Sequence, residues 1–252
     1  AGSTTTSPIA MNRRLQLAAA LPLLALSACG DSANGAANDD TLQIAVVPKG
    51  TTHEFWKSVH AGAEAAAQDL GVEIIWKGPI REDDRAEQIQ IVENFVVRGV
   101  DGIVLMPMDR KALVTPAEEA GGQGIPVVVA DSDLDWDGRT SFVATDNRRG
   151  GELAGEALAA MMGGEGSVIL LRYQEGSAST FEREEGFLTA IGQAEGIEVI
   201  SSNQYAGATN EGAYQASENL LNSFTDVDGI FCPNESAAFG MLRALQDSGR
   251  TD

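Results

Sequence analysis

Several side chains that could bind a polar ligand stand close together after the first apolar segment of the chain. Lys49 and His53 offer hydrogen bonds, and Phe55 and Trp56 offer aromatic faces. They follow an apolar run and precede a helical pattern, as in the first strand-to-helix turn of an α/β fold, where ligands lie beyond the carboxyl ends of the strands. A purely structural role is the alternative, in which the two aromatic residues staple the start of the helix to the core.

Three more side chains at element ends could bind hydroxyl groups. Asp131 follows an apolar strand pattern and could accept hydrogen bonds from two neighbouring hydroxyls, and the amide of Asn234 could bridge two others. The planar guanidinium of Arg183 suits paired hydroxyl or carboxylate oxygens. The structural alternatives are capping for Asp131 and Asn234, and pairing with neighbouring glutamates for Arg183.

Motifs for catalysis or metal binding are scarce. The two histidines, His53 and His60, stand seven residues apart, and the sequence contains no HExxH, GxSxG, GxGxxG or P-loop motif. The aspartates of 133–137 resemble the start of a calcium loop, but Ala144 occupies the position that requires glutamate. We therefore expect no enzyme activity, no cofactor and no metal site.

The charge balance argues against two classes of partner, nucleic acid and anionic lipid. The formal net charge is -20, whereas nucleic-acid binding requires a basic face, and adhesion to anionic lipid through a basic patch requires clustered Lys and Arg.

Cys232 ends an apolar run and is expected to be a small buried hydrophobic residue.

The N-terminal part resembles a bacterial lipoprotein signal. Residues 11–14 are a basic segment, 15–26 are almost entirely apolar and too short to span a membrane well, and Ser27 and Ala28 precede Cys29. The resemblance implies removal of the signal peptide 11–28, lipidation of Cys29 and a membrane-anchored place in the periplasm or cell envelope. An ordinary secretory signal is the alternative, and 29–41 is expected to be a flexible tether.

From residue 42 the chain alternates strand and helix patterns, which predicts an α/β fold with parallel sheets. The expected strands are 42–47, 72–76, 102–106, 126–130, 167–171, 198–201 and 229–232. The expected helices are 55–69, 84–98, 110–121, 148–162, 181–194, 210–223 and 236–248. The rhythm breaks at 131–147, which divides the chain into an N-terminal lobe, 42–144, and a second lobe, 145–252.

With these positions assembled, the chain closely resembles the periplasmic sugar-binding proteins of the ribose-binding type, the solute receptors of ABC importers. The matching segments are 53–56 (HEFW), Asp131, 142–151 (FVATDNRRGG), 183–187 (REEGF), 232–236 (CPNES) and 240–246 (GMLRALQ). The resemblance implies the type I periplasmic binding protein fold, with two doubly wound lobes, a hinge and sugar bound in the cleft.

The resemblance also implies roles for the residues singled out above. Phe55 and Trp56 would stack on the sugar, and His53 falls where the family often has a polar contact. The residues expected to bind its hydroxyls are Asp131, Arg183 and Asn234.

Two positions depart from the family pattern. Ser132 stands where the family commonly has Arg, and Lys49 is unusual at the end of the first strand. We include both among the expected ligand-binding residues, and together they favour a sugar other than ribose, or a charged polyol. The family continues with a further strand after the helix 236–248, so the second lobe is expected to be incomplete at its C-terminus.

The function expected from these features is that of a monomeric solute-binding protein that presents a monosaccharide to an ABC permease. Two alternatives stay open: a periplasmic sugar sensor that feeds a signalling receptor, and a binding protein for a charged polyol or another small polar solute.

Overall fold

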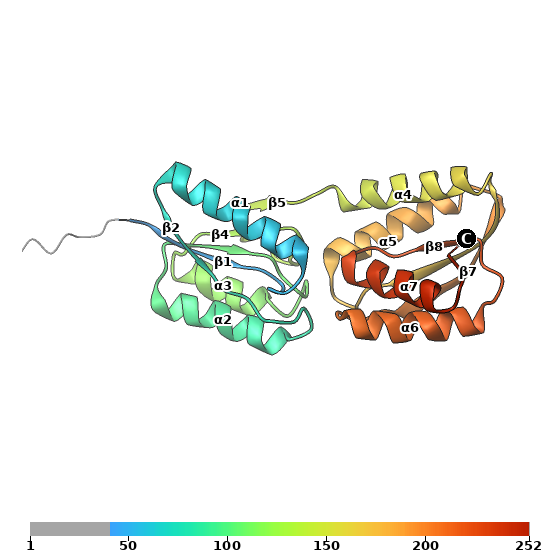
Figure 1. Cartoon of the computed structure of the whole chain (residues 1–252). Coiled ribbons are helices and arrows are strands. Elements are labelled where there is room, and N and C mark those ends of the chain that lie inside the picture. Colours follow the sequence, from blue (N-terminus) through green and yellow to red (C-terminus); the bar gives the residue numbers. More distant parts are fainter. Residues whose placement is uncertain (1–40, 252) are drawn as a thin grey trace, which may run out of the picture. The chain divides into compact units, whose positions relative to one another are not determined.

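The computed structural model describes residues 41–251, and it begins with a five-stranded parallel sheet (Figure 1). The strand order is β2-β1-β3-β4-β5. The strands are β1 (Gln43–Val47), β2 (Glu73–Trp76), β3 (Gly102–Leu105), β4 (Val127–Ala130) and β5 (Ser141–Val143). We call β1 to β5 with their helices the first lobe. The expected signal peptide, Cys29 and nearly all of the tether lie outside the described residues.

Three helices cover the two faces of this sheet. They are α1 (Glu54–Leu70), α2 (Arg85–Arg98) and α3 (Val114–Gly122). Ala45, Val47 and Leu105 point toward a core shared with α2 and α3, whereas Val46 and Met106 point to the opposite face and pack with Trp56 of α1. The alternation places side chains on both faces, which is why β1 is apolar after its first residue, from Ile44 to Val47.

A second parallel sheet, of order β7-β6-β8, forms the centre of the second lobe. Its strands are β6 (Glu165–Arg172), β7 (Gly196–Tyr205) and β8 (Gly229–Phe231). Its helices are α4 (Asn147–Met161), α5 (Ala178–Ile191), α6 (Asn210–Ser223) and α7 (Glu235–Asp247). One face of β6 packs against α4 and α5, and the other packs against α6 and α7.

Glycine residues allow α4 and α5 to pack backbone against backbone. A Cβ added to Gly151 of α4 would lie 1.9 Å from the carbonyl oxygen of Arg183, and one added to Gly186 of α5 would lie 2.1 Å from the carbonyl oxygen of Arg148. Only glycine, which has no side chain, fits at these two contacts. This close approach fixes the part of α5 that bears Arg183.

The parallel α/β fold in two lobes is confirmed, and two predicted helix starts are wrong. Asp109 accepts hydrogen bonds from the backbone of Lys111 and Ala112, so 110–113 forms turns and α3 begins only at Val114. In contrast, α5 begins at Ala178, before Phe181. Arg183 therefore lies in the second turn of α5 rather than near its first residue.

The described helices contain no segment that is long and apolar enough to cross a membrane.

Candidate functional site

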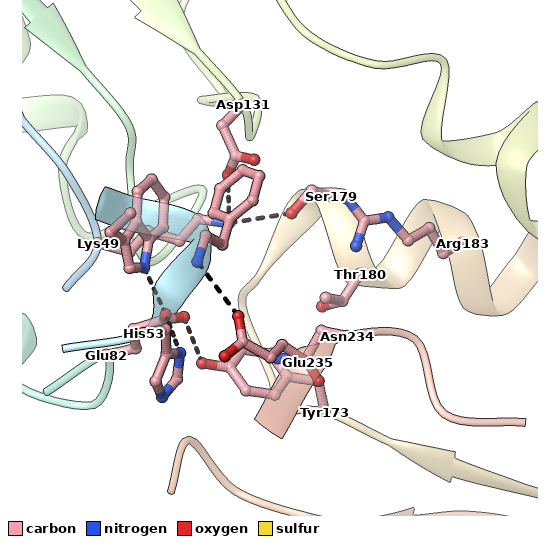
Figure 2. Close-up of a pocket in the computed structure, with 12 residues that line it drawn as sticks. Lys49, His53, Glu82, Asp131, Tyr173, Ser179, Thr180, Arg183, Asn234 and Glu235 are labelled. Carbon is pink, nitrogen blue, oxygen red and sulfur yellow. Dashed lines mark hydrogen bonds and ion pairs between the residues drawn. The ribbon is translucent and has the colours of Figure 1, made fainter. Parts of the chain in front are cut away.

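A pocket of about 170 Å³ lies where loops at the strand ends of the first lobe meet residues of the second lobe (Figure 2). Residues 41–251 all belong to one compact unit, so this site lies within a single body. The lining residues are Lys49, His53, Phe55, Trp56, Glu82, Asp131, Tyr173, Ser179, Thr180, Arg183, Asn234 and Glu235. Its volume is below the roughly 300–1,000 Å³ of sites for drug-sized ligands, which favours a small ligand.

Lys49 joins the two lobes at one side of the pocket. Its Nζ lies 2.9 Å from Oδ2 of Asp131 and donates a 2.9 Å hydrogen bond to Oγ of Ser179 on α5. Lys49 is only 4% exposed, so these two partners, rather than water, surround and stabilise its ammonium group. Figure 2 shows both contacts as dashed lines.

Asp131 has an unusual backbone conformation. Its φ of 61° makes it the one non-glycine residue among 41–251 with a positive φ, a conformation that costs a side-chain-bearing residue free energy. Its amide donates a 2.9 Å hydrogen bond to the carbonyl of Val143 on β5. The strand end and β5 thus hold the carboxylate toward Lys49, and its second oxygen is left for a ligand.

Glu82 is a pocket residue that the sequence analysis missed. Its Oε1 accepts a 2.6 Å hydrogen bond from the indole of Trp56 and lies 2.8 Å from Nδ1 of His53. Its Oε2 accepts a 2.7 Å hydrogen bond from the hydroxyl of Tyr173, which belongs to the second lobe. Glu82 is 7% exposed, and its polar loop 77–84 gave no periodic pattern from which the position could be inferred.

These contacts determine the protonation of the group. Burial alone would raise the pKa of Glu82, but hydrogen bonds from His53, Tyr173 and Trp56 outweigh burial and hold that pKa below its ordinary value. The hydrogen bond to Glu82 raises the pKa of His53. Burial, together with the charge of Glu82, raises the pKa of Tyr173, which therefore remains a neutral hydrogen-bond donor.

The two predicted aromatic residues are placed differently. Phe55 is 48% exposed and lines the pocket, whereas Trp56 is 3% exposed and packs into the first-lobe core. Their rings meet edge to face, with centroids 4.9 Å apart. Phe55 can therefore offer a ring face to a ligand, while Trp56 combines the predicted pocket position with the alternative, a core role.

Arg183 reaches the pocket from α5 and is held by polar groups of the second lobe. Its Nε donates to Oδ1 of Asn147 at 2.8 Å, and its Nη1 donates to the carbonyl of Pro233 at 2.9 Å. The neighbouring glutamates do not pair with it, because Glu182 contacts Arg148 and Glu184 binds Arg172. The alternative of glutamate pairing is therefore wrong, and Nη2 remains available to a ligand.

Asn234 lines the pocket and also caps a helix. Its Oδ1 accepts a 3.3 Å hydrogen bond from the amide of Ala237, and its Nδ2 donates to Ser236. One N–H of the amide is left. Glu235, the next residue, accepts a 3.3 Å hydrogen bond from the amide of Phe55 and thereby links the lobes.

Ser132 corrects the expected set, because it does not line the pocket. Its side chain is 1% exposed, and its Oγ accepts a 3.0 Å hydrogen bond from the amide of Ser179. Ser132 therefore stabilises the first turn of α5 through this hydrogen bond rather than facing the pocket. Ser179 and Thr180 take pocket positions that the sequence analysis missed, because the predicted helix began after them.

The other polar candidates have structural roles. Asp133 and Asp135 contact Arg139 and Arg110, respectively, and 41–251 contains no cluster of three or more metal-ligating side chains. Cys232 packs against the core of α6 and α7, and burial raises its pKa to about 12, so it is a protonated thiol at neutral pH.

With this geometry established, comparison with known proteins identifies the family. A family model described as a periplasmic binding protein domain matches residues 44–252. The chain belongs to this family. The ribose import binding protein RbsB of Escherichia coli is 32% identical over 237 residues, which are 94% of this chain and 77% of that protein. The D-ribose/D-allose-binding protein of Pseudomonas aeruginosa is 31% identical and covers 91% of this chain and 75% of its own length.

A solved structure supports the same relationship. An ABC transporter solute-binding protein from Agrobacterium vitis with bound D-fucose has a TM-score of 0.79 and 35% sequence identity, and the match covers 82% of this chain and 73% of that one. The type I fold and the resemblance to ribose-type binding proteins are thus confirmed. Membership in a family of binding proteins also confirms that the chain is not an enzyme.

Proposed function

We propose that this periplasmic protein binds a neutral monosaccharide in the pocket between its lobes and delivers it to the permease of an ABC importer. One observation supports this proposal most directly: unused donors and acceptors from both lobes converge on a small cavity beside an exposed aromatic ring. Relatives that bind ribose, allose and fucose support the same class of ligand.

The available groups match the vicinal hydroxyls of a sugar. Within residues 41–251, Asp131 and Glu235 each retain a carboxylate oxygen without a partner, and Arg183 retains its Nη2. A hydroxyl can donate to such a carboxylate while it accepts from the guanidinium. Phe55 would cover an apolar face of the ring.

The balance of charge favours an uncharged ligand. The pocket has as many anionic as cationic side chains. The cationic side chains are Lys49, Arg183 and, when protonated, His53, and the anionic side chains are Glu82, Asp131 and Glu235. The positive charge of Lys49 is already neutralised by Asp131 at 2.9 Å. The structure therefore argues against the charged polyol that Lys49 suggested in the sequence.

Binding would act by stabilising the closed arrangement of the lobes. A sugar that contacts Asp131 in the first lobe and Arg183 in the second has more contacts when the lobes are together, so it shifts the population toward that state. The closed form would be the one that the permease accepts. No covalent chemistry is involved.

The test is calorimetric titration of the purified protein with ribose, allose, fucose, arabinose, xylitol and a sugar acid. We expect one neutral sugar to bind with micromolar or lower Kd, and Asp131→Ala and Arg183→Ala to weaken binding at least 100-fold, as for charged hydrogen-bond partners worth about 3 kcal/mol. Arg149→Ala is the matched control, since Arg149 pairs with Glu152 and Glu156 on the exposed side of α4.

A folded protein that binds no neutral sugar, or that binds only the sugar acid, would overturn the proposed ligand class. Delivery is tested separately. Uptake of the labelled sugar should be lost in cells that lack this protein and restored by the wild type but not by Arg183→Ala.

A further inference from the structure

Glu82 differs from the other acidic groups of the pocket because the protein itself uses most of its hydrogen-bonding capacity. A carboxylate has about four lone-pair sites, and three are taken by Trp56, His53 and Tyr173. Figure 2 shows the Glu82 carboxylate between the side chains of His53 and Tyr173. It is therefore poorly placed to be a main acceptor for a ligand.

The partners of Glu82 come from both lobes. Trp56 and His53 stand at the start of α1, whereas Tyr173 follows β6 of the second lobe. The backbone adds a further link, because the carbonyl of Glu82 accepts a 3.0 Å hydrogen bond from the side chain of Gln174. A single residue thus connects the aromatic side of the pocket with the opposite lobe.

The chain is built to bring Glu82 to this position. A Cβ on Gly50 would lie 2.7 Å from Cγ of Glu82, so only glycine at residue 50 leaves room for the side chain. The adjacent Lys49 contributes a favourable charge. Buried carboxylates without hydrogen-bond partners are costly, and Glu82 has three such partners, the side chains of Trp56, His53 and Tyr173.

We propose that Glu82 is a positioning residue of the binding site, which sets the rings of His53 and Trp56 and ties them to Tyr173 when the lobes close. Its effect on sugar affinity rests on the proposed function, whereas its effect on His53 does not. Because Tyr173 contributes a neutral donor, the interlobe bond forms without a change in its protonation.

Several charged groups surround His53 and must be considered in any titration. Glu82 contacts its Nδ1, and Glu235 of α7 acts at longer range. Arg81 and Glu211 share an adjoining pocket with it. Of these, Glu82 has the largest effect on His53, so replacing Glu82 should dominate the response.

The first experiment is an NMR titration of histidine-labelled protein without ligand. The chain has only two histidines, so His60, which pairs loosely with Glu64 at 3.4 Å, is an internal control. We expect Glu82→Gln to lower the pKa of His53 and to leave the His60 titration curve unchanged. An unchanged His53 titration in the folded variant would overturn the proposal.

The second experiment tests the link between lobes and remains informative if Glu82→Gln does not fold. Tyr173→Phe removes only the hydroxyl, and Tyr205→Phe is the matched control because Tyr205 ends β7 outside the pocket. With the sugar selected by calorimetry, we expect Tyr173→Phe to raise koff about tenfold with little change in kon. Equal koff in the two variants would refute the interlobe role.

A double variant completes the design. If Glu82 acts through Tyr173, then Tyr173→Phe should have no further effect in a Glu82→Ala background, where the tyrosine hydroxyl has lost its acceptor, and additive effects would contradict the proposal. If no sugar binds, the proposed function fails while the His53 titration still decides whether Glu82 sets the neighbouring ring.

Discussion

Two adjacent glycines of α4 should respond to alanine in opposite directions. A Cβ on Gly151 would lie 1.9 Å from the carbonyl oxygen of Arg183, whereas a Cβ on Gly150 would have no neighbour within 4 Å. Both residues lie within the same helix. The pair therefore separates the effect of helix propensity from that of the contact between α4 and α5.

The geometry sets the size of the effect. Cβ contacts shorter than 3.0 Å essentially do not occur, so Gly151→Ala must move α5 by at least about 1.1 Å, and two backbones cannot yield as a flexible side chain would. Overpacking costs about 1–3 kcal/mol, here near the upper end, and helix propensity returns about 1 kcal/mol. We expect a net loss of about 2 kcal/mol for Gly151→Ala and a gain of about 0.5–1 kcal/mol for Gly150→Ala.

Thermal unfolding followed by circular dichroism and calorimetry measures this contrast. At about 2–4 °C per kcal/mol for a domain of this size, Gly151→Ala should melt about 4–8 °C below the wild type and Gly150→Ala slightly above it. Sugar affinity should fall for Gly151→Ala alone, because the displaced backbone is that of Arg183. A Gly151→Ala protein that melts with or above Gly150→Ala would refute the reasoning.

Two further predictions concern the charged pairs. Lys49→Met leaves Asp131 without its cation and should destabilise the protein by about 2–3 kcal/mol, less than the roughly 3–5 kcal/mol of a fully buried pair because Asp131 keeps some contact with water. Urea unfolding should show that Lys49→Met/Asp131→Asn recovers part of the lost stability, and a Lys49→Met protein as stable as the wild type would contradict this. The pair of His53 and Glu82 predicts a pH dependence: the raised pKa of His53 gives stability that is full below about pH 6.5 and is lost as pH rises through the folded value, and the lowered pKa of Glu82 gives stability that is lost as acid protonates it. The free energy of unfolding should vary less with pH above about pH 6 in His53→Gln than in the wild type. An unaltered dependence on pH would exclude this pair as the cause.

Much of the fold follows from local patterns in the chain. Continuous apolar runs predict strands buried on both faces, and the alternation with amphipathic segments predicts parallel sheets, because parallel strands need a long crossover connection, which is usually a helix. The first residue of a helix is harder to predict, because side chains near it can compete with the helix for backbone hydrogen bonds. The side chain of Asp109 bonds the following backbone and delays α3, an interaction that periodicity does not reveal.

Some residues of the candidate site could likewise be selected from the sequence, whereas others could not. Residues directly after strands, such as Asp131 and Asn234, could be selected from the sequence because parallel strands bring their carboxyl ends to one edge. Their roles as ligand-binding residues stay predictions. Ser132 and Ser179 show the limit of this approach, since their places depend on how α5 begins and packs.

Local sequence therefore determined the order and type of the elements, the family and the residues at strand ends, because these depend on near neighbours along the chain. Tertiary structure alone decided that Lys49 is neutralised by Asp131, that Trp56 is buried and that Glu82 joins His53 to Tyr173. Glu82 and Tyr173 are 91 residues apart in the chain. The bond between Glu82 and Tyr173 forms only when the two lobes meet, whereas the other contacts join separate segments of the first lobe. No periodic pattern in any of these segments encodes its partner.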